Sequence, residues 1–166
     1  MRTAIRCSST EKQTGWKNIG NQWYFFNQQT GAMLENEWYK DSTGAQYYLK
    51  SGGYMACNEE LNLGGSYFRF NSAGRLCENE WYTSYGKTYF YKGGGYRAIN
   101  EWVNIGGNWF RFDSDYTMLE NKWYFDGVNY YWLKQGGYMA KNETVVINGQ
   151  KNLFNGSGVW QGTIIR

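Results

Sequence analysis

A short pattern recurs along this chain and limits the folds that the chain can adopt. One copy opens at Trp16, passes through a Trp-Tyr-Phe-Phe run at residues 23–26 and closes at Met33. Successive openings are 22, 23, 20, 21, 21 and 21 residues apart, at Trp16, Trp38, Leu61, Trp81, Trp102, Trp123 and Thr144. A fixed period near 20 residues indicates an array of one supersecondary unit rather than a single compact core.

Each copy holds a short aromatic run between stretches that are rich in Gly, Asn, Asp and Ser. Aromatic residues favour strands and the flanking residue types favour turns, so each copy is predicted to be a β-hairpin. The predicted second strands are residues 23–26, 46–49, 67–70, 88–91, 109–112, 130–133 and, with a weaker pattern, 151–154. A unit of ~20 residues cannot offset the entropy of its own ordering, so neighbouring units must stack. The predicted fold class is all-β, a β-hairpin solenoid of six to seven units.

The array predicts one repeat domain at residues 15–166, after a flexible polar arm at residues 1–14. A longer period is superimposed on the short one, because Lys-x-Gly-Gly-Tyr recurs every 42 residues, at residues 50–54, 92–96 and 134–138. The last unit has Thr144 in place of the opening Trp and is predicted to cap the array.

Side chains alternate between the two faces of a strand, which divides each four-residue run into two pairs of positions. The second and fourth positions are apolar or aromatic in all six clear units, so we expect them to form a buried spine. The first and third positions vary from Trp to Gln, Thr and Arg. We therefore expect the first and third positions to form the binding face.

Composition argues against several classes of function. The chain has 20% aromatic residues, no histidine and a net charge of only +3. Without histidine there is no His-based acid–base catalysis and no His-ligated metal, and we predict no catalytic residue, metal site or cofactor. The scattered basic residues argue against nucleic acid as a partner. A glycan hydrolase that uses the carboxylates of the repeated links is the disfavoured alternative from another class, since catalysis needs one unequal pair in one cleft.

Cysteines and possible targeting segments carry little information. Cys7, Cys57 and Cys77 match no zinc-binding spacing and are expected to be free thiols, although a Cys57–Cys77 disulfide is conceivable. No apolar run approaches the ~20 residues that span a membrane. Residues 1–14 contain no secretory signal, so we expect either another export route or a fragment of a longer protein.

The opening Gly-Trp at residues 15–16, the run at residues 23–26 and the Gly-Ala-Met at residues 31–33 resemble the choline-binding, or cell-wall-binding, repeat. This repeat occurs in Gram-positive surface proteins and phage lysins, and the resemblance covers about residues 15–162. The resemblance implies a non-catalytic module at the cell wall or outer surface that recognises choline of teichoic acid. It also implies that the module is the targeting part of a wall hydrolase, a phage lysin or a surface protein. Similar repeats bind α-glucan in extracellular glucosyltransferases, so a glucan-binding module is the alternative. A homodimer through the terminal hairpins is a further expectation.

In that family, aromatic rings and often a methionine from consecutive hairpins enclose the trimethylammonium group of choline. The resemblance implies that a cage combines an opening Trp, the first-position ring, the closing Met and the third-position ring of the next unit. Two full cages are predicted, Trp16, Trp23 and Met33 with Tyr48, and Trp102, Trp109 and Met118 with Trp132. A partial cage is predicted from Trp123, Tyr130 and Met139. Arg69 and Arg111 are predicted to contact anionic groups of a wall polymer.

Overall fold

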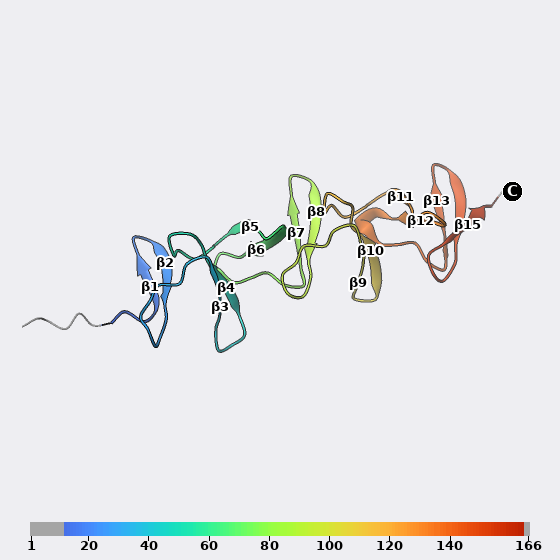
Figure 1. Ribbon diagram of the computed structural model, residues 1–166. Coiled ribbons are helices and arrows are strands. Elements are labelled where there is room, and N and C mark those ends of the chain that lie inside the picture. The colour runs from blue at the N-terminus through green and yellow to red at the C-terminus, as the bar shows by residue number, and fades with distance from the viewer. Residues whose placement is uncertain (1–11, 165–166) are drawn as a thin grey trace, which may run out of the picture. The chain divides into compact units, whose positions relative to one another are not determined.

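The structure, a computed structural model, describes residues 12–164 (Figure 1). Within these residues every regular element is a β-strand except one 3-10 turn, η1 at Gln135–Gly137, so the predicted all-β hairpin fold is confirmed. None of the described helical segments is long and apolar enough to cross a membrane. Cys7 and most of the predicted arm lie outside the described residues, and the predicted domain limits stay predictions.

The chain divides into two compact units, Met1–Cys77 and Glu78–Arg166. The first unit contains three antiparallel hairpins in sequence order. Their strands are β1 (Gly15–Ile19) with β2 (Gln22–Phe26), β3 (Glu37–Lys40) with β4 (Gln46–Leu49), and β5 (Glu59–Leu63) with β6 (Ser66–Phe70).

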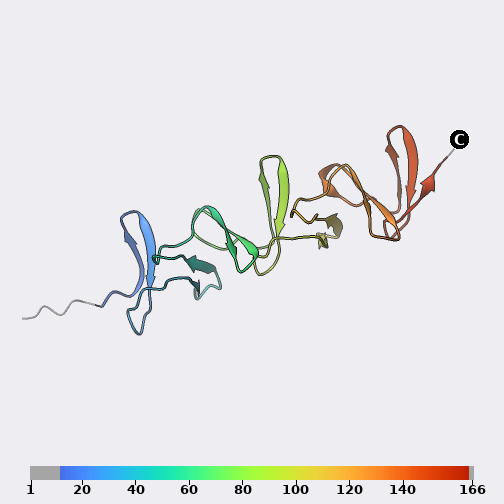
Figure 2. The ribbon, with the colours of Figure 1, turned by 45° about the horizontal axis from the view of Figure 1, so that its top comes forward.

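The second unit contains three more hairpins and a terminal three-stranded sheet. The hairpins are β7 (Glu80–Ser84) with β8 (Lys87–Tyr91), β9 (Trp102–Ile105) with β10 (Asn108–Arg111), and β11 (Lys122–Phe125) with β12 (Tyr130–Leu133). The terminal sheet is β13 (Glu143–Ile147), β14 (Gln150–Phe154) and β15 (Trp160–Thr163). In this unit β7–β8 and β13–β14, three hairpins apart along the chain, extend to the same side in both views (Figures 1 and 2).

The predicted second strands coincide with β2, β4, β6, β8, β10, β12 and β14 to within one or two residues. The register corrects one predicted opening, because Glu60, and not Leu61, lies opposite the third-position residue Arg69. Leu61 instead lies opposite Phe68. With Glu60 as the opening residue, the spacings become 22, 22, 21, 21, 21 and 21, which removes the irregularity in the period.

An asparagine in the left-handed backbone region precedes the first strand of six hairpin units. Asparagine adopts this region more readily than most other residues. The six have φ values between 43° and 53°: Asn36, Asn58, Asn79, Asn100, Asn121 and Asn142. The repeated Asn link therefore sets the direction in which the chain enters each new hairpin.

Consecutive hairpins are joined by one recurring backbone hydrogen bond. At Met55, Leu76, Met118 and Met139 the closing residue of a hairpin donates its N–H to the carbonyl of the first-position residue in the preceding hairpin. In the first unit Met55 donates to Trp23 at 2.7 Å, and in the second unit Met139 donates to Trp109 at 2.9 Å. Methionine side chains at closing positions also pack against a turn glycine of the following hairpin: Met33 on Gly53, Met55 on Gly74, Met118 on Gly137 and Met139 on Gly158.

The predicted spine is confirmed at the fourth position and only in part at the second, where Tyr47, Phe68 and Phe110 are buried but Tyr24, Tyr89 and Tyr131 are half-buried. Five of the six fourth-position side chains are completely buried at 0% exposure: Leu49, Phe70, Tyr91, Phe112 and Leu133. The third position does not lie on an exposed face as predicted, since Phe25, Phe90 and Arg111 are all buried. The reason is the stacking direction. The face with the first and third positions packs against the second- and fourth-position face of the next hairpin, as when Trp81 contacts Phe110 and Phe112.

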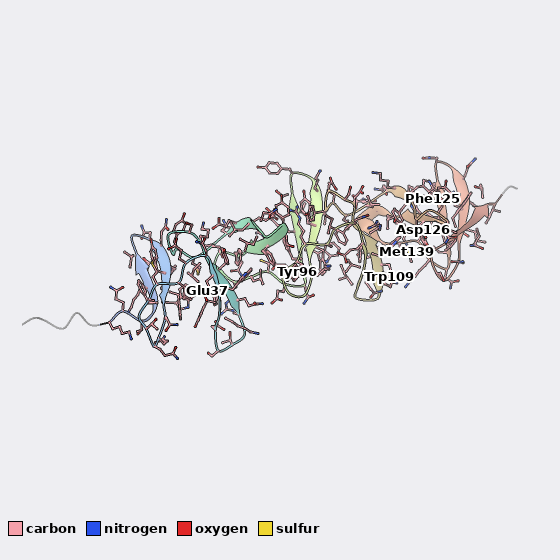
Figure 3. All side chains as sticks on the ribbon, viewed as in Figure 1. Glu37, Tyr96, Trp109, Phe125, Asp126 and Met139 are labelled. Carbon is pink, nitrogen blue, oxygen red and sulfur yellow. The ribbon has the colours of Figure 1, made fainter. Side chains whose placement is uncertain are left out.

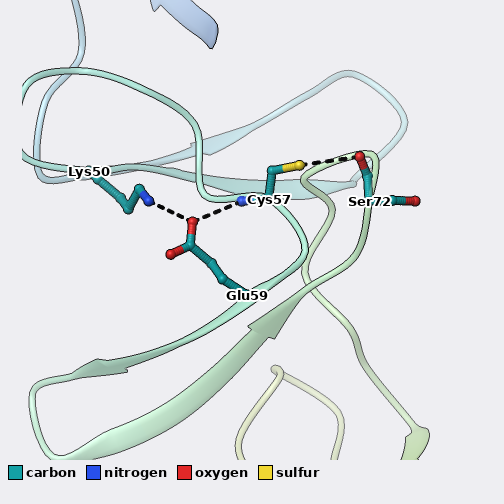
Figure 4. A network of polar contacts seen from close by, with 4 residues as sticks. All are labelled: Lys50, Cys57, Glu59 and Ser72. Atoms are coloured by element: carbon teal, nitrogen blue, oxygen red, sulfur yellow. Dashed lines mark hydrogen bonds and ion pairs between the residues drawn. The ribbon is translucent and has the colours of Figure 1, made fainter. Parts of the chain in front are cut away.

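The Lys-x-Gly-Gly-Tyr motif holds a hairpin joint through a repeated ion pair. Lys50 pairs with Glu59 at 2.6 Å, and the same Glu59 oxygen accepts the N–H of Cys57 at 3.1 Å (Figure 4). The pair recurs every 42 residues as Lys92–Glu101 and Lys134–Glu143, each at 2.7 Å. Cys57 is exposed with its Sγ near the carbonyl of Ser72, while Cys77 is buried, and both are free thiols.

Tyr85 is a strained residue at the tip of the β7–β8 turn. Its φ is 49°, and its ring is fully exposed. The same turn in other hairpins uses glycine or asparagine, as in Gly64–Gly65 and Asn148–Gly149. Because asparagine tolerates this conformation, we expect Tyr85→Asn to raise the free energy of unfolding by about 0.5–1 kcal/mol. Unfolding curves in guanidinium would measure this gain in stability. An unfolding midpoint that is unchanged or lower in Tyr85→Asn would show that the Tyr85 backbone is not strained.

Candidate functional site: aromatic cages between consecutive hairpins

Exposed aromatic faces gather where one hairpin meets the next. In the second unit a cavity of about 480 Å³ lies between β9–β10 and β11–β12. Its lining is Trp102, Trp109, Tyr131, Met139, Gly156 and Ser157, of which the first four are called here the Trp109 cage. None of these lining residues is charged.

The Trp109 cage takes its rings from both hairpins. The Trp102 ring meets the Tyr131 ring at 5.3 Å and 64°, so the two faces are steeply inclined to each other. Trp109 is 40% exposed and its carbonyl accepts the N–H of Met139, which fixes the closing methionine beside it (Figure 3). The cage is therefore held by the same hydrogen bond that joins the hairpins.

An equivalent set occurs in the first unit and is called the Trp23 cage: Trp16, Trp23, Tyr47 and Met55. The Trp16 ring lies 6.5 Å from Trp23 and 5.1 Å from Tyr47, both edge-on. A cavity of about 240 Å³ beside Trp23 and Met55 is also lined by the Lys50–Glu59 pair. The Trp23 cage therefore has charged neighbours, unlike the Trp109 cage.

Three rings near the end of the chain form a third site, the Trp160 box: Trp123, Tyr130 and Trp160. The three pairs of rings have centroid distances of 5.8–6.4 Å and interplanar angles of 76–87°, so the rings form mutually perpendicular walls. They line a cavity of about 470 Å³. Trp160 donates its indole N–H to Oδ1 of Asn152 at 3.0 Å, which fixes the orientation of that ring.

Two other joints keep an opening Trp but lack a first-position ring. Gln46 stands in the first position of the joint opened by Trp38, and Thr88 stands there in the joint opened by Trp81. At both joints the ring supplied by the next hairpin is a phenylalanine, Phe68 or Phe110.

The predicted groupings require correction, although the predicted opening and first-position rings lie at these sites. Tyr48 and Trp132 do not reach back to the preceding hairpin. They pack across their own hairpins, Tyr48 on Trp38 at 5.2 Å and Trp132 on Trp123 at 5.3 Å. The third-position side chains point toward the following hairpin, so Tyr47 and Tyr131 of the second position supply the third ring instead.

The predicted methionines are displaced by one unit for a related reason. Met55, Met118 and Met139 are each hydrogen-bonded to the hairpin that precedes their own, so each lies at the joint between those two hairpins. Met118 lies at the Trp81 joint rather than in the Trp109 cage, and Met139 lies in the Trp109 cage rather than with Trp123. Met33 closes the first hairpin and packs on Gly53, and Met55 takes the place beside Trp23 that was predicted for Met33.

Arg111 is not available to a wall polymer, contrary to prediction. It is 5% exposed, and its guanidinium donates to the carbonyl of Phe112, to Oδ1 of Asn100 at 2.6 Å and to the Tyr124 hydroxyl at 3.1 Å. Its charge also lies 4.5 Å from the Tyr124 ring centre. Arg111 therefore stabilises the joint. Arg69 is half-buried, and its role as an anion contact stays a prediction.

The sequence analysis did not predict a role for Trp160 or Asp126. Trp160 follows Met139 by 21 residues and so occupies the closing position of the last unit, a signal that was present in the period. Asp126 accepts the hydroxyl of Tyr131 at 2.9 Å, and no pattern in the sequence indicated that contact. Among the described residues no cluster of acidic and cysteine side chains could hold a metal ion.

These joints define the class of protein as a hairpin-repeat protein with exposed aromatic clusters between consecutive hairpins. Comparison with protein families specifies it further. Residues 13–59 match the choline-binding repeat, and residues 100–115 match a putative cell wall binding repeat. Both matches are to the family that the sequence predicts, and repeats of this family are non-catalytic binding modules.

Solved structures agree. The choline-binding domain of CbpL from Streptococcus pneumoniae is 28% identical with a TM-score of 0.76, over 89% of this chain and 77% of that one. Choline binding protein F from the same organism is 26% identical with a TM-score of 0.72, over 89% and 51%. The modular autolysin LytC, also pneumococcal, is 26% identical with a TM-score of 0.62, over 91% and 43%. The chain thus spans about half or less of the last two. A search of curated protein sequences found no match.

Proposed function

We propose that this chain is a cell-wall-binding module that recognises choline through the Trp109 cage, the Trp23 cage and the Trp160 box. One observation carries the proposal. Exposed ring faces converge on cavities whose lining, in the Trp109 cage and the Trp160 box, contains no charged side chain.

The chemistry of these cavities suits a quaternary ammonium. Its nitrogen carries no hydrogen and cannot donate a hydrogen bond, so the negative faces of aromatic rings are its natural partners. Each such contact contributes ~0.5–2 kcal/mol, so one cage binds weakly. Several cages on one chain gain affinity for a polymer that carries repeated choline groups, as teichoic acid does, through effective concentration.

The similarity to an autolysin and to pneumococcal choline-binding proteins supports a setting at the wall of a Gram-positive bacterium. In that setting the chain would attach a wall hydrolase, a phage lysin or another surface protein to its polymer. Catalysis would belong to a part of such a protein other than these repeats.

The Trp81 joint favours glucan as a second candidate ligand. Its cavity of about 400 Å³ combines the exposed rings of Trp81 and Tyr138 with Thr88, Asn108 and Glu120. A sugar can stack its apolar face on a ring while its hydroxyls bond to such polar groups.

Retention on two resins separates the candidates. The chain is expected to bind a choline-amine resin and to elute with free choline, while passing through a dextran resin. Retention on dextran with no release by choline would replace the proposed ligand by glucan. Soluble sugar released from purified cell wall would show a hydrolase and contradict the assignment as a binding module.

Trp109 offers a direct test of the cage. Replacing it with alanine removes one ring face from the cavity and should weaken choline binding there by about 1–2 kcal/mol, or roughly five- to thirtyfold. The fold should persist because Trp109 is not part of the buried spine. Choline titration followed by tryptophan fluorescence measures the change, with Tyr85→Asn as the control for an exposed ring outside any joint. Equal affinities in Trp109→Ala and wild type would mean that the ring only packs.

A further inference from the structure

The two full cages share a feature that the joints opened by Trp38 and Trp81 lack: a carboxylate bonded to the hydroxyl of the tyrosine ring. In the Trp109 cage the Tyr131 hydroxyl donates to Oδ2 of Asp126 at 2.9 Å. In the Trp23 cage the Tyr47 hydroxyl donates to Oδ2 of Asp41 at 3.2 Å. Each Asp belongs to the turn of the hairpin that supplies the tyrosine, so ring and carboxylate arrive together.

The other carboxylate oxygen anchors the turn and fixes the aspartate in place. Oδ1 of Asp126 accepts the N–H groups of Val128 and Asn129 at 2.8 and 2.7 Å. These backbone hydrogen bonds, that of Asn129 first, lower the pKa of Asp126 and keep it ionised. Burial raises the pKa of Tyr131, and the bond to Asp126 raises it further, so the phenol stays protonated. A neutral phenol donating to a carboxylate is a charge-assisted hydrogen bond.

The chain provides its own comparison. At the joints opened by Trp38 and Trp81, the ring in the position of Tyr47 and Tyr131 is a phenylalanine. Those two joints also lack a first-position ring. A tyrosine hydroxyl bonded to a carboxylate therefore occurs in the two full cages. It is absent from the two joints that have no first-position ring.

The physical consequence is electrostatic. A carboxylate that accepts a hydrogen bond from the phenol polarises the ring and makes its face more negative. This strengthens the attraction for a cation and leaves contact with a neutral group unchanged. The geometry points to Asp126 as a positioning residue that tunes the Trp109 cage for cationic ligands, with Asp41 as its weaker counterpart in the Trp23 cage. This inference rests on choline being the ligand.

Asp41 is the weaker of the two because Tyr47 has a second partner. Nε of Arg75 donates to the Tyr47 hydroxyl oxygen at 3.3 Å and withdraws electron density from the same phenol. Asp41 also accepts more hydrogen bonds than Asp126, because its Oδ1 accepts the N–H groups of Thr43 and Ala45 and the hydroxyl of Thr43. Within residues 12–164 no cationic side chain donates to the Tyr131 hydroxyl, so its ring receives the full effect of Asp126.

The test compares choline with its uncharged tert-butyl analogue, dimethylbutanol, on the Trp109 indole N–H resonance. Asp126→Asn retains an oxygen for the turn but removes the charge, and should weaken choline about two- to fivefold, the range of exposed charge interactions. Binding of dimethylbutanol should not change. Asp41→Asn should weaken choline less, and only at Trp23. Equal losses for both ligands would reduce Asp126 to a structural role, and an unchanged choline affinity would also overturn the inference.

A double-mutant cycle shows whether Asp126 acts through the phenol. Tyr131→Phe keeps the ring and should itself weaken choline, and adding Asp126→Asn to it should have no further effect. An undiminished effect of Asp126→Asn in the Tyr131→Phe background would contradict action through the hydroxyl. Failure of the proposed function looks different, because wild-type Trp109 would then not respond to choline at all.

Discussion

Arg111→Ala is expected to lower the free energy of unfolding by about 2–4 kcal/mol. The substitution leaves a cavity in the joint between β9–β10 and β11–β12. It also removes the donor that serves Asn100 and Tyr124 at 2.6 and 3.1 Å. The carbonyl of Phe112, a fully buried residue, would also lose its charged donor, and a buried acceptor without a partner incurs a desolvation cost. Chemical unfolding of the whole chain, followed by circular dichroism, measures the loss.

The matched control is Arg69→Ala, at the same third position of the third hairpin. Arg69 is half-buried where Arg111 is buried, so its loss should lower the free energy of unfolding by about 1 kcal/mol or less. Equal losses at the two positions would contradict the structural role of Arg111. So would an unchanged stability combined with weaker binding to an anionic wall polymer.

Gly137→Ala is expected to destabilise the chain by about 2–4 kcal/mol. Two effects add at this position. Gly137 has φ 80°, a conformation that alanine adopts with strain, and a methyl group there would overlap the side chain of Met118. The methionine is fixed at its backbone by the hydrogen bond to Thr88 at 2.8 Å, so only its side chain can yield.

Gly107→Ala separates the two effects. Gly107 has φ 83°, almost the same backbone, but a methyl group there meets nothing within 4 Å. Its substitution should therefore cost only the backbone strain, about 1 kcal/mol. Truncating Met118 to alanine should recover part of the stability lost in Gly137→Ala and none of that lost in Gly107→Ala. Equal losses in the two glycine variants would show that the methionine contact does not stabilise the joint.

The sequence predicts the hairpins well because each is a local structure. Aromatic runs between turn residues located every second strand, and the alternation along each strand located the fourth-position spine, including Leu49 and Phe112. These inferences use only residues that are close in sequence.

The joints were harder to predict because they depend on how one hairpin stacks on the next. Alternation shows that Arg111 and Trp109 share a face but not which neighbour that face meets. The assumption that third-position side chains reach backward misplaced Tyr48 and Trp132, and assigning each closing methionine to its own hairpin misplaced Met33, Met118 and Met139. Their correct neighbours follow from the backbone hydrogen bond between the closing residue and the preceding hairpin, which no local pattern reveals.

A choline titration followed on the indole N–H resonances of all the tryptophans tests the central claim most directly. The resonances of Trp23, Trp109 and Trp160 should shift with saturation, because these rings line the three proposed sites. Those of Trp38 and Trp81 should stay near their starting positions, because Gln46 and Thr88 replace a cage ring at their joints. Uniform small shifts at every tryptophan, or a saturating response confined to Trp38 and Trp81, would contradict the assignment of the cages.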